Sequence, residues 1–286
     1  MARKATIWVP DDLQRDSGIH APESWSSFSR HCLAEGDSWF SLAALPGGNV
    51  LQELVLEHDT LVVSTAYPGD TLKHIVDWRR NVPFVKLLAD RRLGRAWDAV
   101  LLSAGGNDLI DAALSPKGIL RRCSGGEATP EECLDDAGVR TFESYLRANM
   151  EEIINLRDGR GSPNRGVPIV MHTYDFPTAR PAPALFMNGP GVFGPWLYRA
   201  YTEHATPEPL WVPLTDLLIN RLADLLCGLD LPGLHVVNTR DSLIRADERA
   251  KGDSGDWLNE IHANRDGRKK IARRLSKKLD ELLSRA

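Results

Sequence analysis

Apolar residues in this chain gather in short runs, and longer stretches with apolar residues at helical spacing separate those runs. The short runs predict strands and the periodic stretches predict helices. The expected strands cover residues 32–34, 61–64, 97–103, 167–172 and 234–237. The expected helices cover residues 49–57, 71–93 with a break at Pro83, 141–156, 196–204, 213–226 and 267–285, and a polar loop is expected between residues 107 and 141. Strands that alternate with helices in this way predict an α/β fold with a mainly parallel five-stranded sheet covered on both faces.

The alternation continues without an interdomain linker, so a single domain is expected over residues 1–286. Residues 1–31 carry no motif and form an N-terminal extension, in which residues 7–9 either add an edge strand or pack on the surface. Residues 173–212 combine aromatic residues with Pro and Gly and are too long for a minimal connection. This segment is expected to be either a lid or cap over a substrate or a packed surface loop.

Polar motifs directly follow the first three expected strands. Gly36-Asp37-Ser38 follows the first strand, Gly69 follows the second, and Gly105-Gly106-Asn107-Asp108 follows the third. Ligands of parallel α/β sheets bind at the carboxyl ends of the strands. Ser38, Gly69 and Asn107 are therefore expected to meet at one edge of the sheet.

Taken in this order, and followed by His262 near the C-terminus, these motifs resemble the four sequence blocks of the GDSL/SGNH hydrolase superfamily. The resemblance covers most of the chain, from about Cys32 onward. It implies a three-layer α/β/α, flavodoxin-like fold and a serine hydrolase that cleaves carboxylic esters through an acyl-enzyme without a cofactor. The substrate would be a small-molecule or lipid ester, and short acyl esters, thioesters and acetylated sugars all fit the superfamily.

The resemblance also implies roles for individual residues. Ser38 would be the nucleophile, and His262 would take its proton and return it to the leaving group. The oxyanion hole would combine the backbone N–H groups of Ser38 and Gly69 with the side-chain amide of Asn107. Taken by themselves, Ser38 could be a turn or cap residue and Asn107 a helix N-cap.

The base and its supporting residue have alternatives in the sequence. His172 follows a strand at the same sheet edge and is the main alternative to His262, and His31 is a weaker one. The superfamily usually carries an aspartate three residues before the histidine, where this chain has Asn259. An amide oxygen can accept from the imidazole N–H but supplies no charge to stabilise the imidazolium.

Three arrangements around the histidine stay open at this point. In the arrangement we expect, Asn259 orients His262 and the site works mainly as a Ser–His pair. In the two others, the carboxylate of Asp256 or of Glu260 takes the place of the usual aspartate. These carboxylates, with Asp253 and His262, also resemble a loose metal cluster. Their spacing matches no ligand motif, so no metal site is expected.

Two other classes of function fit parts of the pattern. The replacement of aspartate by Asn259 would suit a catalytically weak ligand-binding protein on the same fold. An unrelated flavodoxin-like nucleotide binder would need a phosphate-binding loop after the first strand, and Gly36-Asp37-Ser38-Trp39 is a poor one.

The composition limits the classes of partner and the cellular location that we expect. Hydrophobic residues make up 42% and charged residues 26% of the 286 residues, and the formal net charge of -4 argues against a nucleic-acid-binding surface. No apolar stretch is long enough to span a bilayer. The N-terminus lacks the apolar core of a signal peptide, which predicts a cytoplasmic location. There Cys123 and Cys133 would be free thiols, whereas they could pair in an exported protein.

Overall fold

The computed structural model describes residues 2–15, 24–41, 48–92, 94–123, 128–185 and 192–284. Its main sheet has six strands in the order β10-β7-β6-β3-β5-β2, and every neighbouring pair is parallel. These strands are β2 (Thr6–Trp8), β3 (Arg30–Gly36), β5 (Thr60–Ser64), β6 (Ala99–Ser103), β7 (Ile169–His172) and β10 (Leu234–Val237). Two short antiparallel pairs lie outside it: β1 (Arg3–Lys4) with β4 (Val55–Leu56), and β8 (Ala184–Leu185) with β9 (Val192–Phe193).

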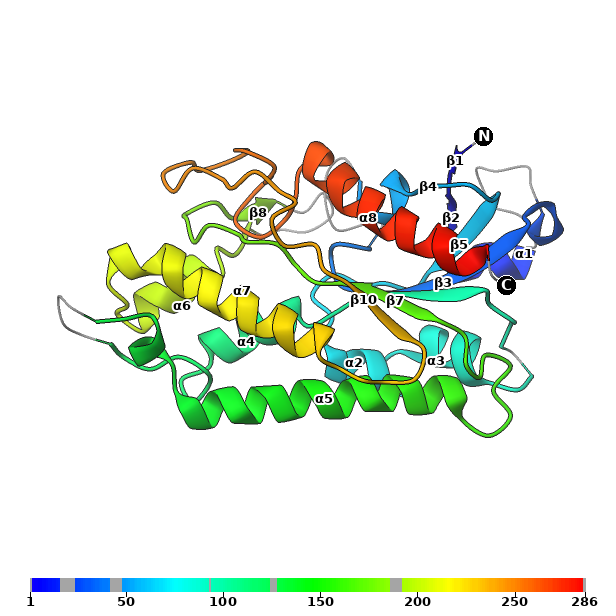
Figure 1. The fold of residues 1–286 in the computed structure, drawn as a ribbon, viewed down its shortest axis with the longest axis horizontal. Coiled ribbons are helices and arrows are strands. Elements are labelled where there is room, and N and C mark those ends of the chain that lie inside the picture. Colours follow the sequence, from blue (N-terminus) through cyan, green and yellow to red (C-terminus); the bar gives the residue numbers. More distant parts are fainter. Residues whose placement is uncertain are drawn as a thin grey trace.

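Helices cover both faces of the sheet and complete three layers (Figure 1). The C-terminal helix α8 (Arg265–Leu283) lies on one face, and α2 (Leu72–Val76), α3 (Val82–Ala89) and α5 (Asp136–Asp158) lie on the other. The remaining helices are α1 (Pro10–Arg15), α4 (Gly106–Leu114), α6 (Leu197–Glu203) and α7 (Trp211–Cys227), with short 3-10 turns at η1 (Trp25–Ser27), η2 (Leu51–Glu53), η3 (Glu131–Cys133) and η4 (Glu208–Leu210). The predicted three-layer α/β architecture is therefore confirmed.

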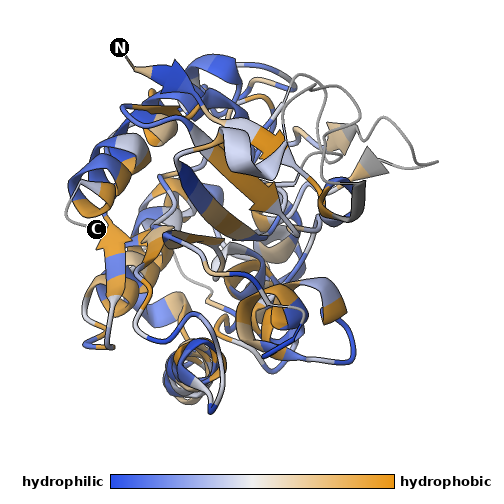
Figure 2. Cartoon of the chain, turned by 90° about the vertical axis from the view of Figure 1, so that its right-hand side faces the viewer, coloured by the Kyte–Doolittle hydropathy of each residue, from blue (hydrophilic) through white to orange (hydrophobic). Residues whose placement is uncertain are grey.

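The core follows from the composition of the central strands. Every residue of β5 and β6 is buried, as expected for strands covered on both faces, and both are rich in Val and Leu. Figure 2 shows apolar strands in the interior, with hydrophilic residues on the outward sides of the helices. The amphipathic helices α5 and α8 turn their apolar residues toward this core.

The strand count was underestimated by one. Residues 7–9 were expected either at the sheet edge or on the surface, and the structure places β2 at the edge, paired with β5. Part of the expected N-terminal extension thus belongs to the main sheet. Residues 16–23 of that extension lie outside the described part of the chain, as do residues 186–191 of the segment expected to be a lid.

One expected helix and one expected loop were wrong. Residues 49–57 form only the short turn η2 and the strand β4, because Val55 and Leu56 pair with β1 and thereby extend the backbone. Conversely, the polar loop expected after Asn107 begins with helix α4. Its apolar residues Leu109, Ile110 and Ala113 are buried at helical spacing, a signal that the Gly and Asp residues at the start of this stretch obscured.

The described part of the segment 173–212 begins with a well-packed stretch. Residues 173–184 are mostly buried, and a hydrogen bond from the backbone N–H of Glu260 to the carbonyl oxygen of Ala182 ties the segment to the chain before His262. Helix α6 follows in the same segment. Its role as a lid stays a prediction.

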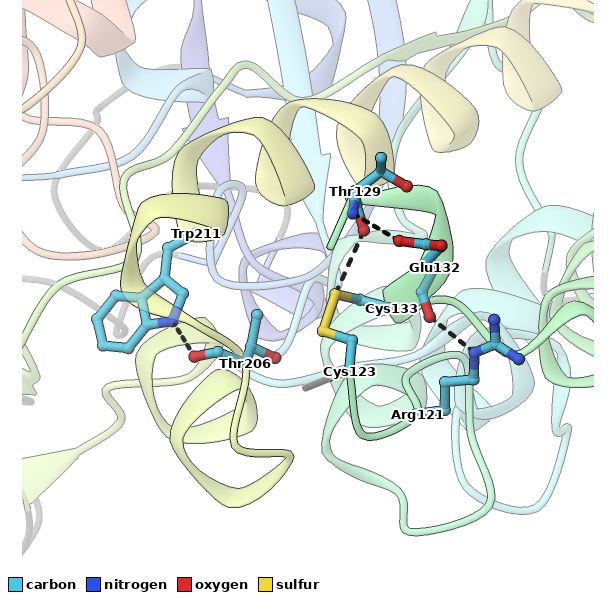
Figure 3. The surroundings of a disulfide bond; sticks show 7 residues. All are labelled: Arg121, Cys123, Thr129, Glu132, Cys133, Thr206 and Trp211. Carbon is cyan, nitrogen blue, oxygen red and sulfur yellow. Dashed lines mark hydrogen bonds between the residues drawn. A yellow bond between two sulfur atoms is a disulfide. The ribbon is translucent and has the colours of Figure 1, made fainter. Parts of the chain in front are cut away.

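A disulfide joins Cys123 to Cys133 in the connection between α4 and α5 (Figure 3). The backbone N–H of Arg121 donates to the carbonyl oxygen of Cys133 at 2.9 Å, and that of Asp135 donates to Ile119 at 2.9 Å. The free thiols expected for a cytoplasmic protein are therefore wrong, and the pairing is the one the sequence allowed for an exported chain. No helix in the described part of the chain combines the length and apolar character that crossing a bilayer requires.

Candidate active site

The turn after β3 carries Ser38, and Gly36 makes this turn possible. Gly36 has a φ of 152°, and a Cβ atom there would lie 2.4 Å from the carbonyl oxygen of Ser103 in the neighbouring strand. Only glycine allows β3 and β6 to approach this closely. The backbone N–H of Asp37 donates to the same carbonyl oxygen at 3.0 Å, which fixes the turn and presents Ser38 at the carboxyl edge of the sheet.

Ser38 pairs with His262, which arrives from the segment before α8. The Ser38 Oγ lies 2.7 Å from His262 Nε2, and His262 Nδ1 lies 2.9 Å from Asn259 Oδ1. Asn259 Oδ1 also accepts the backbone N–H groups of Ile261 at 3.1 Å and His262 at 3.0 Å. Three donors converge on this oxygen, so the amide turns its oxygen, not its N–H₂ group, toward the imidazole. The proton of a neutral His262 then sits on Nδ1, and the Nε2 lone pair faces Ser38.

The two carboxylates that could have replaced the usual aspartate are engaged elsewhere. Asp256 Oδ2 accepts from Lys270 Nζ and from the backbone N–H of Ile244, both at 2.5 Å. Glu260 accepts the backbone N–H of Tyr198 at 2.6 Å, and burial raises the pKa of Glu260 to about 7. In the described chain, no group of three or more His, Cys, Asp or Glu side chains is arranged to hold a metal ion.

The surroundings of His262 keep it neutral. Its side chain is buried, and this loss of solvation lowers its pKa to about 3. The ring of Trp196 packs edge-on against it with centroids 5.4 Å apart. A neutral imidazole whose Nε2 lone pair faces the Ser38 hydroxyl is the form that a general base requires.

The expected oxyanion residues lie on two connected segments. Asn107 stands in the first turn of α4 and donates from Nδ2 to the carbonyl oxygen of Asp70 at 3.0 Å. This bond ties α4 to the turn of Gly69, which has a φ of 83° and open space where a Cβ would project. The N-cap of α4 is Gly105, so Asn107 does not cap the helix. One N–H of its amide remains beyond the bond to Asp70.

A pocket opens beside Ser38. Asn107 and Gly106 line it together with Ser38, so the candidate nucleophile and the candidate oxyanion donor face the same space. Most of its other walls are apolar: Trp39, Leu109, Ile110, Tyr174, Pro177, Leu197, Ile219, Trp257 and Ile261. The arrangement suits a carbonyl group at Ser38 with an apolar substituent in the pocket.

A second buried network lies behind the turn, and sequence analysis missed most of it. Ser103 Oγ lies 2.8 Å from Asp37 Oδ1 and 3.0 Å from His172 Nε2, while His172 Nδ1 lies 2.7 Å from the carbonyl oxygen of Thr173. The hydroxyl of Tyr174 donates to Asp37 Oδ2 at 2.5 Å. Ser103 and Tyr174 were detectable, because one ends the third expected strand and the other follows His172.

The groups of this network carry fewer protons than its hydrogen bonds require. The carbonyl oxygen of Thr173 takes the single N–H of a neutral His172, and Ser103 has one hydroxyl proton for two neighbours. All these contacts are satisfied only when one further proton is bound, on Asp37 or on His172. Burial raises the pKa of Asp37 to about 6 and lowers that of His172 to about 4, which favours Asp37 as its place.

His31 lies away from this edge. It stands near the amino end of β3, where its ring stacks on Trp25 with centroids 3.9 Å apart. The structure therefore brings together Ser38, His262, Asn259 and Asn107, joins the turn of Gly69 to them through Asp70, and leaves His31 outside.

Comparison with solved structures finds proteins similar to this chain, and the first of those named here shares its fold. A lipase from a goat rumen metagenome matches with a TM-score of 0.52 at 14% identity, over 87% of this chain and 97% of that one. An aryl esterase from M. smegmatis matches at 14% identity over 89% and 100% of the two chains, with a TM-score of 0.45. An acetylxylan esterase from Geobacillus stearothermophilus matches at 13% identity over 88% and 94%, with a TM-score of 0.43.

No family model matches the sequence, and no curated protein matches it significantly. The likeness lies in the fold, at identities too low to carry a function across. The comparison with the lipase shows the fold that the GDSL/SGNH hydrolase resemblance implied.

Proposed function

We propose that this protein is a serine hydrolase that cleaves carboxylic esters through an acyl-enzyme on Ser38. The observation that carries the proposal is the 2.7 Å contact between Ser38 Oγ and His262 Nε2 on the wall of an apolar pocket. The fold, shared with a lipase, supports the same reading.

The first half of the reaction forms the acyl-enzyme. His262 Nε2 takes the hydroxyl proton as Ser38 Oγ attacks the ester carbonyl carbon, and the carbonyl oxygen becomes an oxyanion. When this intermediate collapses, the bond to the alcohol oxygen breaks and His262 gives its proton to that oxygen. The alcohol leaves, and the acyl group stays on Ser38.

The second half repeats the steps with water. His262 takes a proton from a water molecule, whose oxygen attacks the acyl carbon and forms a second oxyanion. Collapse returns the proton to Ser38 Oγ and releases the carboxylic acid. His262 thus carries a proton from Ser38 to the leaving alcohol in the first half and from water to Ser38 in the second.

Asn259 serves as a positioning residue in this scheme. Its oxygen holds the Nδ1–H of His262 and so selects the tautomer whose Nε2 can act as base. Being neutral, Asn259 stabilises the imidazolium formed during the reaction less than an aspartate would. The resulting site is a Ser–His pair oriented by an amide.

Three N–H groups would stabilise the oxyanion: the backbone N–H groups of Ser38 and Gly69 and the remaining N–H of Asn107. The bond from Asn107 to Asp70 supports this proposal, because it fixes the Asn107 amide and the Gly69 turn relative to each other before a substrate binds. Donors fixed in advance are worth most in catalysis, since they need not reorganise during the reaction.

A catalytically weak binding protein on the same fold is the second candidate, and the neutral Asn259 is the observation that favours it. A nucleotide-binding role receives less support, because Asp37 Oδ1 accepts the backbone N–H of Trp39, a donor that a phosphate would use. Both remain outcomes of the test below.

Pre-steady-state hydrolysis of nitrophenyl acetate decides between these functions. The hydrolase predicts a burst of nitrophenol that matches the enzyme concentration, followed by slower turnover, and both phases vanish in Ser38→Ala. A binding protein would be stabilised against thermal unfolding when it binds the ester, and it would release no nitrophenol. That result would overturn the proposal.

A further inference from the structure

Two apolar pockets meet at a single side chain of α4. The pocket beside Ser38 and a second, smaller one are both lined by Leu109. Ile119, Val139, Phe142, Leu218 and Leu225 supply the other apolar walls of the second pocket. Leu109 is 4% exposed and separates the two spaces.

Helix α7 repeats this division. Ile219 lines the pocket beside Ser38, and the preceding residue, Leu218, lines the second pocket. The second pocket ends at Glu143 and at the exposed Arg221, so its far side reaches the surface. The two pockets therefore form one apolar path from Ser38 outward, interrupted at Leu109.

The position of His262 tells which part of an ester this path would take. The leaving alcohol oxygen must receive its proton from Nε2 of His262, so the alcohol departs on the side of His262 and Trp196. Among the described residues, neither of these two lines the pocket, whereas Ser38 and Asn107 do. With the alcohol beside His262 and the oxyanion at Asn107, the acyl chain is the part of the ester left to enter the pocket. Leu197 and Ile261, the chain neighbours of Trp196 and His262, complete its wall.

We propose that the pocket beside Ser38 binds the acyl chain of the substrate and that Leu109 sets the length of chain it accepts. The inference rests on the proposed ester hydrolysis and adds its substrate class: esters of short, unbranched, apolar acids. The chain stops at Leu109, and the second pocket is an extension that the wild-type protein closes.

The walls beyond Leu109 are held in place, so opening the barrier would expose a formed space. The carbonyl oxygen of Ile119 accepts the backbone N–H of Asp135 at 2.9 Å, and the disulfide between Cys123 and Cys133 (Figure 3) closes the same connection between α4 and α5. Each methylene group that enters an apolar pocket gains about fourfold in binding. Replacing Leu109 by alanine removes about three carbons from the barrier and should admit a similar length of acyl chain.

The experiment compares kcat/KM for nitrophenyl esters from acetate to decanoate in the wild type and in Leu109→Ala. The wild type should prefer the short esters. The variant should shift its optimum by about two to three methylenes and raise kcat/KM for the newly accepted esters by roughly 10-fold or more. A second series, acetates of alcohols of rising length, should give the same profile in both proteins.

Two controls separate the barrier from general damage. Leu109→Met conserves volume and should keep the wild-type profile. Leu275→Ala makes the same truncation in α8, on the other face of the sheet, where Leu275 is fully buried. Leu275→Ala should lower the melting temperature without changing the acyl-chain length at which kcat/KM is highest. If Leu109→Ala does not fold, Leu109→Val gives a smaller opening and a smaller shift in the same direction.

The outcomes are distinct. Ser38-dependent hydrolysis with an unchanged acyl profile in a folded Leu109→Ala or Leu109→Val would overturn the acyl pocket and leave the proposed function standing. A shift in the alcohol series instead would show that the pocket holds the leaving group. If the wild type hydrolyses none of the esters through Ser38, the proposed function fails, and the acyl pocket fails with it.

Discussion

Two serine–histidine pairs lie at the same edge of the sheet and differ in what they can reach. Ser38 Oγ is 2.7 Å from His262, and Ser103 Oγ is 3.0 Å from His172. In both pairs the Nδ1 atom of the histidine faces an oxygen, that of Asn259 or that of the Thr173 carbonyl. Burial lowers the pKa of both histidines, to about 3 for His262 and about 4 for His172.

Access separates the two pairs. Ser38 lines the pocket, whereas Ser103 is fully buried at the end of β6 and its hydroxyl faces Asp37. The second pair supports the turn that carries Ser38, because Asp37 precedes the nucleophile and Ser103 also accepts the backbone N–H of Asp37. A short Ser–His contact therefore becomes a candidate catalytic pair only where the serine can also meet a substrate.

The largest expected effect tests this difference directly. Ser38→Ala should reduce kcat for nitrophenyl acetate by about 10⁴-fold or more, as expected for a lost nucleophile. Ser103→Ala should reduce kcat less than about 10-fold, but it should lower the free energy of unfolding by roughly 1–3 kcal/mol, since His172 and Asp37 lose a buried partner. Steady-state kinetics and urea denaturation of both variants measure the two effects. Equal losses of activity would erase the distinction between the pairs.

The next effect concerns the oxyanion. Asn107→Ala should lower kcat by about 10²–10³-fold with little change in KM, because it removes one fixed donor from the transition state. Asn107→Asp keeps the shape, replaces the donor by an acceptor and should be at least as inactive. A drop in melting temperature with unchanged kcat would assign Asn107 to structure, as the tie between α4 and Asp70 alone.

The third effect concerns the oxygen that holds His262. Asn259→Asp should raise kcat at neutral pH by about 10-fold, because a charged hydrogen-bond acceptor stabilises the imidazolium more than an amide does. Asn259→Ala should lower kcat. Asp256→Ala, which removes a carboxylate bound to Lys270, serves as control and should leave kcat near the wild-type value.

Asn259→Asp should also shift the pH dependence of kcat/KM. The acid limb of wild-type kcat/KM is expected below the usual histidine pKa, since burial lowers the pKa of His262 to about 3 and keeps it neutral in mild acid. The carboxylate of Asn259→Asp would raise that pKa and shift the limb toward higher pH. An unshifted limb would show that a group other than His262 controls it.

The last effect lies in the second pair and concerns stability, not activity. Burial raises the pKa of Asp37 from 3.8 to about 6, so its protonated form stabilises the fold below about pH 4, and that contribution is lost as the pH rises through 6. The contribution of His172 has the opposite pH dependence. Because burial lowers the pKa of His172, this contribution is present above the usual histidine pKa and is lost as the pH falls toward 4. Asp37→Asn removes the first contribution alone. Urea denaturation should show a larger deficit of the variant near pH 4 than near pH 7, by roughly 2–3 kcal/mol.

Much of this arrangement was predictable from the sequence, for a physical reason. Glycine and polar residues that follow buried strands must lie at one sheet edge, so Ser38, Gly69 and Asn107 could be placed before the structure was known. Helix α4 was missed because its first turn is built from Gly, Asn and Asp, residues that usually indicate a loop. Its role as the barrier between two pockets therefore could not be foreseen.

The support for His262 could not be predicted from residue spacing. Asn259, Asp256 and Glu260 all lie within reach along the chain, and what separates them is where each side chain is already bonded. Lys270 from α8 binds Asp256, and the backbone at the start of α6 binds Glu260. Both contacts come from tertiary packing, which no local pattern reports.

Mapping the adduct of a fluorophosphonate probe by peptide mass spectrometry tests the central claim most directly. The account predicts a single adduct on Ser38 in the wild type and in Ser103→Ala, no adduct in Ser38→Ala, and labelling slowed by at least about 10³-fold in His262→Ala. An adduct on Ser103, or labelling of Ser38 at an unchanged rate without His262, would contradict it.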